Sequence, residues 1–299
     1  GFQEFVQHAG SLFVLSGHTL CGNAQTAGCQ GAYFGTSMRK ALPCNRLLEF
    51  LPAIDRAHVL ESCDEVDLTF AEVLDEPGSV IRDVYFPTGS SISLLAAMGG
   101  KNLLEVALAG NEGIYGVPLA FGMAISPVRA VVQGGGPALR MRAAAFQREL
   151  TRVPTLRSCV DRYIYVVMSQ LIQTAGCNRF HVVEQRVARW LLMTADRAHD
   201  STFRITHEFL AYMLGVRRVG VTEAASALQR RGLIAYSRGL VTIHDRKGLE
   251  RASCACYRAD VTAYDRAFAD AAVADSRPVA VRRLSRVPLT HLALPDAAE

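Results

Sequence analysis

Two adjacent arginines, Arg217 and Arg218, follow a Leu-Gly pair and precede an alanine-rich stretch whose apolar residues have helical spacing. A guanidinium group keeps its charge at neutral pH, and its planar fork of N–H donors can bond two acceptor atoms at once. Phosphate oxygens and the O6 and N7 atoms of guanine are acceptors of this kind. The pair therefore indicates binding of a polyanion, provided that the surrounding elements present both side chains together.

The elements around the pair are predicted to be two helices joined by a tight turn. Thr206 can cap the first helix, and Gly215 allows the turn that ends it. The second helix runs over 218–231, and Gly232 stops it. Because Ala211 is small, the two helices can cross closely, which is typical of a helix-turn-helix. The inner faces consist of Phe209, Leu210, Met213 and Leu214 in the first helix and Val221, Ala224, Ala225 and Leu228 in the second.

A strand, a two-residue turn and a second strand follow, over "LIAYS", "RG" and "LVTIH". A hairpin at this place makes the unit a winged helix. The second helix of such a unit enters the major groove of double-stranded DNA with its N-terminal residues against the bases, so Arg218 is predicted to read a base. Phosphate contacts are predicted for the residues that flank it, which are Thr206, His207, Arg217, Ser237 and Arg238. A winged helix that binds only protein is the alternative, and the arginine pair argues against it.

The eight cysteines are scattered along the chain, which is typical of a reducing compartment rather than of a disulfide-rich secreted domain. Cys254-Ala-Cys256 is the nearest approach to a metal motif. It has no second pair and no histidine at a familiar zinc spacing, so no metal site is predicted. The gaps between Cys21, Cys29 and Cys44 are too wide and irregular to favour an iron–sulfur cluster.

Enzymatic chemistry finds no support in the sequence. A metal-dependent β-roll enzyme needs histidines that converge inside the roll, and no histidine occurs between His58 and His181. The nucleophile motif Gly-x-Ser-x-Gly is also absent. We therefore predict no catalytic residue, no cofactor and no enzyme activity.

The composition is typical of a folded protein with two domains, since 50% of the 299 residues are hydrophobic and 20% are charged. The net charge of +4 is too small to identify a nucleic-acid-binding protein by itself. No apolar run approaches the roughly 18 residues that a membrane span requires. We expect a cytoplasmic protein without a membrane segment.

The first half of the chain is predicted to form an antiparallel β-roll. Residues 1–40 have no sustained period and are predicted to be a poorly ordered extension. Within 41–150, two short helices precede short β-type runs separated by Pro and Gly turns, and a helix over 143–150 ends the domain. The runs are "EVDLTF", "SVIRDVYF", "SISLLAAM", "LLEVALA", "VRAVVQ" and "ALRM". The predicted fold class is therefore α+β.

A long helix is predicted over 151–180, because Pro154 suits a first helical turn. Five of its apolar residues fall at alternating four- and three-residue steps: Leu156, Val160, Ile164, Val167 and Leu171. This spacing is typical of a seam between two helices, either in a dimer or within one chain. The winged helix is then predicted over 181–258, and a C-terminal tail over 259–299.

The order of strands, long helix and "HEFLAYMLGVRRVGVTEAASALQRRGLI" resembles the Crp/Fnr superfamily of bacterial transcription regulators over about residues 44–258. The resemblance implies a cyclic-nucleotide-binding-like jelly roll, a dimerisation helix, and a winged helix that binds a palindromic operator as a homodimer. It also implies RNA polymerase as a partner, and it favours the dimer for the seam. The base-reading positions of the family fall on Arg218, Val219, Thr222 and Glu223. Val219 replaces a glutamate that is often found there, so a different half-site is expected.

The resemblance further implies an effector pocket in the jelly roll, within "EGIYGVPLAFGMAISPVRAVVQ". Gly113 and Gly116 match the glycines of the phosphate-binding segment in nucleotide-responsive members, and Arg129 is the candidate anion ligand. Ile114 stands where those members have a ribose-binding glutamate, and Ala130 follows Arg129 where they have a serine. Cyclic AMP is therefore not the expected effector, and the sequence does not identify another.

Overall fold

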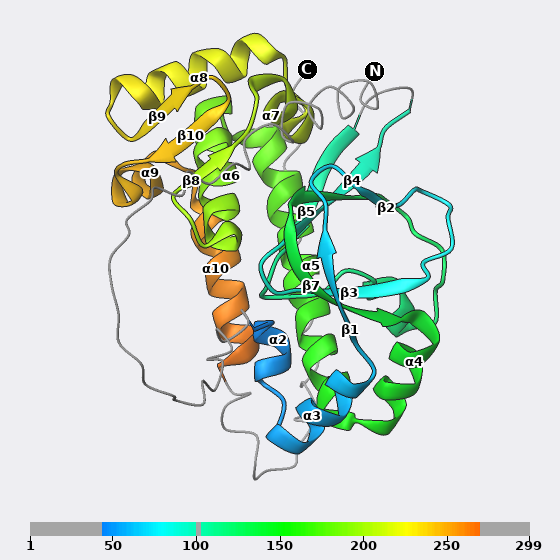
Figure 1. Cartoon of the computed structure of the whole chain (residues 1–299). Coiled ribbons are helices and arrows are strands. Elements are labelled where there is room, and N and C mark those ends of the chain that lie inside the picture. Colours follow the sequence, from blue (N-terminus) through cyan, green and yellow to red (C-terminus); the bar gives the residue numbers. More distant parts are fainter. Residues whose placement is uncertain (1–43, 100–102, 270–299) are drawn as a thin grey trace, which may run out of the picture.

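The computed structural model describes residues 44–99 and 103–269, so the predicted extension over 1–40 lies outside the described residues. Figure 1 shows a β-roll built from the first half of the chain and a helical part with a small sheet built from the second half. A long helix runs between them. The mixture of helices with antiparallel strands confirms the predicted α+β class.

The β-roll consists of two antiparallel sheets, with the strand orders β1-β7-β3 and β2-β6-β4-β5. Side chains alternate across each strand, which buries one face: Val84 and Phe86 of β3 are fully buried, and Val84 lies opposite Met141 of β7. The strands are β1 (Asp64–Leu68), β2 (Val73–Asp75), β3 (Asp83–Pro87), β4 (Ser91–Ala97), β5 (Leu103–Ala109), β6 (Arg129–Gly134) and β7 (Gly136–Arg142). All six predicted runs form strands. β2 was not predicted, because three residues are too few to show alternation.

Four short helical elements contribute to one apolar core at the base of the roll. Asn45 caps α2 by accepting the N–H of Leu48, and its amide group donates to the backbone oxygens of Pro87 and Gly113, which fixes the start of the domain. The helical elements of this part are α2 (Arg46–Glu49), α3 (Ala53–Glu61), the 3-10 helix η1 (Val117–Phe121) and α4 (Ala143–Arg152).

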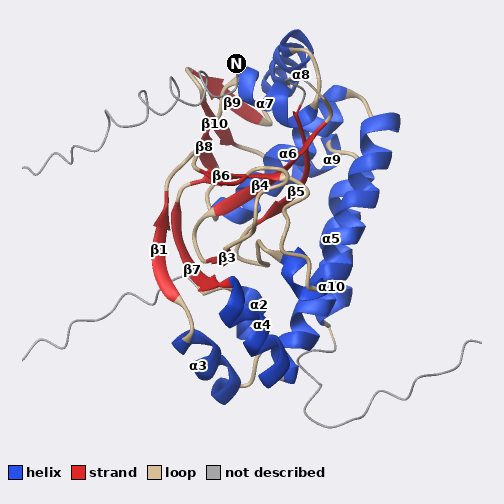
Figure 2. Cartoon of the chain, turned by 90° about the vertical axis from the view of Figure 1, so that its right-hand side faces the viewer, coloured by secondary structure: helices blue, strands red, loops and turns tan. Residues whose placement is uncertain are grey.

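Helix α5 (Pro154–Phe180) runs along one side of the roll, as Figure 2 shows. It begins at the predicted proline. Its inner face, which includes Leu156, Val160 and Tyr163, belongs to the same apolar core as α2, β3 and α4. The long helix therefore stabilises the roll in addition to linking it to the second half of the chain.

The second half forms around α6 (Val183–Ala198), whose Val187, Leu191 and Leu192 are almost fully buried. Two helices and an antiparallel sheet of order β8-β10-β9 pack against it. The elements are β8 (Thr202–Arg204), α7 (His207–Leu214), α8 (Arg218–Arg230), β9 (Ile234–Ser237), β10 (Leu240–Ile243), α9 (Arg246–Ala252) and α10 (Ala255–Phe268). The prediction lacked β8, α9 and α10.

Helix α10 corrects the predicted tail, because residues 259–268 are helical rather than tail-like. The helix packs along α5: Arg162 donates to the backbone oxygen of Ala267 at 2.6 Å, and the ring of Phe268 stacks on Phe50 at 4.6 Å between centroids. Figure 1 shows the two helices side by side. The chain therefore returns from the winged part to the base of the roll.

Buried polar groups join the roll to α6. Ser93 of β4 donates to Glu105 of β5 at 2.6 Å, and Trp190 of α6 donates to the same carboxylate at 2.9 Å. Gln133 of β6 donates to Thr194 of α6 at 3.0 Å. These bonds fix the position of α6 on the sheet. Within the described residues, no helix has the length and apolar character needed to cross a membrane.

Candidate nucleic-acid interface

Helices α7 and α8 have the predicted helix-turn-helix geometry. The Thr206 hydroxyl accepts the N–H of Phe209 at 3.1 Å and so caps α7, which ends at Gly215 with φ of 61°. A left-handed residue at this point favours glycine. The predicted inner faces of both helices are buried against α6. One side of α8 is therefore packed against the core, and the opposite side faces solvent.

The outer side of α8 carries the residues predicted to meet the bases. Arg218, Val219, Thr222 and Glu223 are all exposed, with Val219 62% exposed. Arg217 precedes them as the N-cap residue and is also exposed. Figure 1 shows α8 along the upper edge of the molecule, and at its start Arg217 and Arg218 line a pocket together with Leu103 and Leu104 of the roll. Among the described residues, neither the Arg217 nor the Arg218 side chain has an ion-pair or hydrogen-bond partner.

His207, which was predicted to contact phosphate, makes contacts within the winged helix. Its Nδ1 lies 2.9 Å from the Thr222 hydroxyl, and its Nε2 is buried. The ring stacks on Tyr236 of β9, with 4.3 Å between centroids. Burial lowers the pKa of His207, and the nearby Arg218 lowers it further. The imidazole is therefore neutral near pH 7, and it connects α7, α8 and β9 while the residue stays partly exposed.

The β9–β10 hairpin forms the predicted wing. Its two turn residues, Arg238 and Gly239, have φ of 49° and 76°, the pattern of a type I′ turn that suits the twist of a hairpin. Ser237 and Arg238 are exposed at the tip. Tyr236, which the sequence analysis did not select, donates to the backbone oxygen of Ile205 at 2.8 Å and so fixes the wing beside the start of α7. The sequence did not predict this hydrogen bond, because an aromatic residue in a short strand is common and does not indicate a particular partner.

The residues predicted to bind an effector are engaged inside the roll. Gly113 lies against α5, since a Cβ at this position would be 2.0 Å from Cζ of Tyr163. Gly116 has φ of +106° and lies beside Val84. Arg129 forms a bidentate ion pair with Glu76, at 2.8 and 2.6 Å. Gly113 thus lies against Tyr163, Gly116 lies in a turn, and Arg129 is paired with Glu76.

The predicted seam of α5 is wrong for two of its five residues. Leu156 and Val160 are fully buried in the core of their own chain, so a second chain cannot contact them. Ile164 and Val167 are partly buried against the same core, and Leu171 is 41% exposed. Three more exposed apolar residues of α5 each lie one residue after a predicted seam residue: Tyr165, Met168 and Ile172, which we call the exposed stripe.

The comparison with known domains agrees with this geometry. Residues 185–252 match the family model of the Crp-like helix-turn-helix domain, and this range includes α7, α8 and the wing. Among solved structures, a transcriptional regulator of the Crp/Fnr family from Eubacterium rectale has the same fold. Its TM-score is 0.54 at 16% identity, and the match covers 69% of this chain and 96% of that one.

Residues 185–252 therefore form a Crp-like helix-turn-helix domain.

Two further solved structures have a similar fold. FixK2 from Bradyrhizobium japonicum has a TM-score of 0.56 at 12% identity, over 64% of this chain and 98% of that one. The c-di-GMP responsive global regulator CLP of Xanthomonas campestris has a TM-score of 0.55 at 15% identity, over 64% of this chain and 99% of that one. Identities this low show the fold alone. No curated protein matches the sequence.

Proposed function

We propose that this Crp/Fnr-type protein is a sequence-specific DNA-binding transcription regulator that acts as a homodimer in the cytoplasm and has no enzyme activity. The main support is the outer side of α8, where two arginine side chains extend from the first turn without a partner in the described chain. The fold does not use these charges internally. Exposed arginines without a partner in the fold can bind the phosphates of DNA, and such contacts supply much of the affinity for DNA.

The proposed roles follow from position. Arg218 and Val219 lie in the first turn of α8, the part that meets base edges when such a helix enters the major groove. Arg218 reads guanine through O6 and N7, and Glu223, one turn further, can accept from the amino group of cytosine. Val219 presents an apolar surface that suits a thymine methyl group. Thr222 holds His207 and helps to orient the helix.

Phosphate contacts are assigned to exposed groups around this centre. Arg217 lies at the N-terminus of α8, where the helix dipole also favours an anion. Ser237 and Arg238 lie at the wing tip, and the exposed Thr206 lies at the start of α7. These contacts contribute affinity that does not depend on sequence. For His207 a phosphate contact stays a prediction, because its Nδ1 already lies beside the Thr222 hydroxyl and its Nε2 is buried.

A homodimer through α5 would bring two such surfaces to one operator. The exposed stripe repeats at three- and four-residue steps, the spacing of a helix–helix seam, and Tyr165, Met168 and Ile172 are each more than half exposed in a single chain. Burying these side chains against a second copy would stabilise the dimer. A dimer with twofold symmetry binds a palindromic site, and in this role the protein would act on RNA polymerase.

The roll is proposed to sense an effector other than cyclic AMP. Ile114 is 1% exposed and belongs to the core of the roll, so it offers nothing to a ribose hydroxyl. The charge of Arg129 is already balanced by Glu76. An anionic effector would have to displace this carboxylate. Calorimetry with cyclic AMP tests the point, and micromolar binding that is lost in Arg129→Ala would contradict it.

Selection of bound sequences from a random pool of duplex DNA tests the function as a whole. We expect enrichment of a palindrome whose half-sites are about one helical turn apart. The double variant R217A/R218A should enrich nothing. Arg148→Ala removes an exposed arginine of α4, distant from α8 in the fold, and should select the same palindrome as the wild type.

Two results would overturn the proposal. If the wild-type chain enriches no sequence, the winged helix is a protein-binding module. An enriched site without twofold symmetry would exclude the homodimer but keep DNA binding. The dimer has its own test, because M168E/I172E should give monomers in sedimentation, whereas Ile54→Glu, at an 84% exposed apolar residue of α3, should not.

A further inference from the structure

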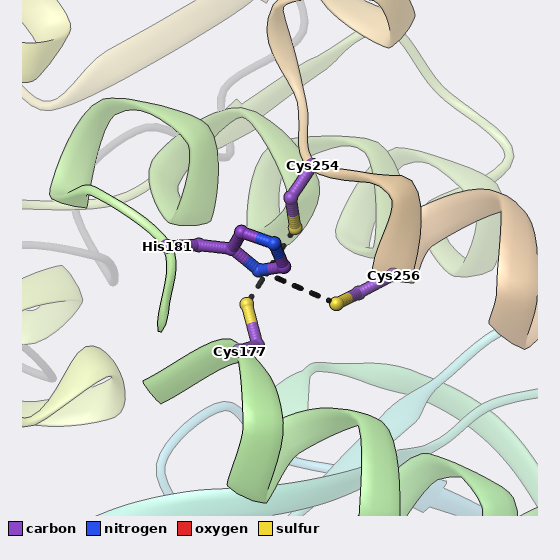
Figure 3. Close-up of side chains that lie close together, drawn as sticks. All are labelled: Cys177, His181, Cys254 and Cys256. Atoms are coloured by element: carbon purple, nitrogen blue, oxygen red, sulfur yellow. Dashed lines mark hydrogen bonds between the residues drawn. The ribbon is translucent and has the colours of Figure 1, made fainter. Parts of the chain in front are cut away.

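Three cysteines and one histidine from distant parts of the sequence meet beside the hinge between α5 and α6. Cys177 lies in the last turn of α5, and His181 is the residue that follows this helix. Cys254 is the N-cap residue of α10, and Cys256 lies in its first turn. Figure 3 shows the three sulfur atoms directed toward the His181 ring. No second pair of ligands lies near Cys254 and Cys256 in the sequence, and the fold supplies Cys177 and His181 from the end of α5.

The four side chains form a cage of the size that one metal ion needs. One ligand atom from each residue lies within 4.8 Å of all the others. The sulfurs of Cys177 and Cys254 are 3.5 Å apart, and the sulfur of Cys256 is 3.5 Å from Nδ1 of His181. Tetrahedral zinc has Zn–S bonds of about 2.3 Å and Zn–N bonds of about 2.0 Å, which separate neighbouring ligand atoms by roughly 3.5 to 3.8 Å.

We propose that Cys177, His181, Cys254 and Cys256 bind one Zn²⁺ ion in a tetrahedral Cys₃His site. The site has all four ligands from protein, and three of them are at most 5% exposed. Zinc sites closed in this way are structural, whereas catalytic zinc keeps one position for water. The ion would therefore stabilise the fold and would not perform a reaction.

The charges around the cage suit three thiolates and one neutral imidazole. Together with Zn²⁺ these ligands carry a net charge of −1. Two buried arginines of α6, Arg186 and Arg189, lie close enough to Cys177 for their charges to act on its thiolate. Arg189 is in turn bound by Asp260, one turn after Cys256 on α10. Outer residues that orient ligands and balance their charge are a usual part of a zinc site.

Other fates of the same residues fit the geometry less well. An iron–sulfur cluster places several irons and sulfides between its thiolates, and so needs a wider cage than one in which all ligand atoms lie within 4.8 Å. A disulfide between Cys177 and Cys254 would involve two of the four groups and would not explain why Cys256 and His181 lie beside them. A single tetrahedral ion uses all four.

A metal ion at this site would connect the two ends of the winged-helix part of the chain. The ligand pairs come from residues 177–181 and 254–256, so the ion closes a loop that contains all of α6, α7, α8, the wing and α9. Both ends of this part would be tied to the end of α5. The ion would thus set the orientation of the winged helix on the long helix, a consequence that rests on the proposed function.

The metal content of the purified full-length chain tests the site directly. We expect one zinc per chain by plasma mass spectrometry. Replacement by Co²⁺ should give the thiolate-to-cobalt charge-transfer band and the intense visible bands of a tetrahedral site. The variant C254S/C256S should lose both signals. Cys44→Ser changes an exposed cysteine outside the cage and should keep one zinc per chain.

His181→Cys tests the histidine ligand without removing a ligand, because a fourth thiolate can replace the imidazole. Loss of metal through misfolding is therefore not expected in this variant. This variant should retain one metal per chain and strengthen the cobalt charge-transfer band by about one third, as expected for four sulfur ligands instead of three. If His181 only packs against the cysteines, the cobalt spectrum will not change. That result would remove His181 from the ligand set.

Three other outcomes would overturn the proposal. These are a chain that takes up neither Zn²⁺ nor Co²⁺, a chain with iron and sulfide, and a chain whose mass shows a Cys177–Cys254 disulfide without metal. The DNA experiment is independent of all three. Arg218→Ala should keep its zinc, so a failure of DNA binding with zinc present counts against the proposed function and leaves the metal site intact.

Discussion

The arginines of α6 and those at the start of α8 are the same residue type in opposite situations. Arg186, Arg189 and Arg197 are 7 to 8% exposed and each is bonded within the fold. Arg217 and Arg218 are exposed, and their side chains have no bonded partner in the described chain. The first group is part of the structure, whereas the second is available to an external partner.

The difference shows that a cluster of arginines predicts function only where the fold leaves the charges unpaired. In α6 the partners come from afar: Asp260 of α10 pairs with Arg189 at 2.6 Å, and Glu112, which follows β5, pairs with Arg197 at 2.6 Å. Burial raises the pKa of Asp260 despite its arginine partner, which reflects a poorly solvated site. Substitutions in α6 should therefore change stability, and those in α8 should change DNA affinity.

The largest expected effect comes from leaving a buried charge unpaired. Asp260→Ala leaves the Arg189 guanidinium without its carboxylate and should lower the free energy of unfolding by about 3 to 5 kcal/mol. Urea denaturation at constant metal saturation measures it. Asp265→Ala, at an exposed position of the same helix, should change little. If R189M/D260L is as unstable as Asp260→Ala, lost packing rather than the unpaired charge is the cause.

The second effect concerns the buried contact between the roll and α6. Burial raises the pKa of Glu105 to about 7 from 4.5, against the opposing influence of its bonds to Ser93 and Trp190 and of the charges of Arg197 and Arg189. The residue as a whole is only half-buried, but its carboxylate accepts both bonds beneath the surface.

Between these two pKa values the folded chain binds more protons than the unfolded chain, so stability should fall as the pH rises through this window and then remain constant. The expected loss is about 2 to 3 kcal/mol. Thermal unfolding between pH 4.5 and 8 measures it. Glu105→Gln should remove this part of the slope, and an unchanged slope would show that another group titrates.

The third effect is on DNA. Arg218→Ala should weaken binding to the selected palindrome by about 1 to 3 kcal/mol per half-site and relax the choice at one base pair. Its free energy of unfolding should change by less than about 0.5 kcal/mol, because the side chain has no partner in the fold. Arg148→Ala is the control. Equal weakening on selected and scrambled DNA would make Arg218 a phosphate contact instead.

The smallest effect is expected at the wing tip. Arg238→Gly removes a charge and also relieves a left-handed backbone that disfavours arginine, so stability should change by less than about 1 kcal/mol. Binding should weaken equally on all sequences, and the salt dependence should become shallower by about one unit. Affinities at several salt concentrations test this. An effect confined to the selected palindrome would make Arg238 a base reader.

Local patterns were sufficient for most elements but not for their contacts. The helix-turn-helix was predictable because Thr206, Gly215 and the apolar spacing of α7 and α8 act within a few residues. The burial of Leu156 and Val160 was not predictable, because the buried and the exposed faces of α5 have the same spacing one residue apart. Only the packing of Leu156 against the roll distinguishes them.

The sequence by itself determined the α+β class, the order of roll, long helix and winged helix, and the exposed positions of Arg217 and Arg218. These depend on period, capping and turn chemistry, which are local. The tertiary structure alone decided that His207 stacks on Tyr236, that residues 259–268 form a helix, and that Cys177 and His181 meet Cys254 and Cys256. Such contacts join residues more than 70 positions apart in the case of the cysteines, and no local rule specifies which distant segments will pack together.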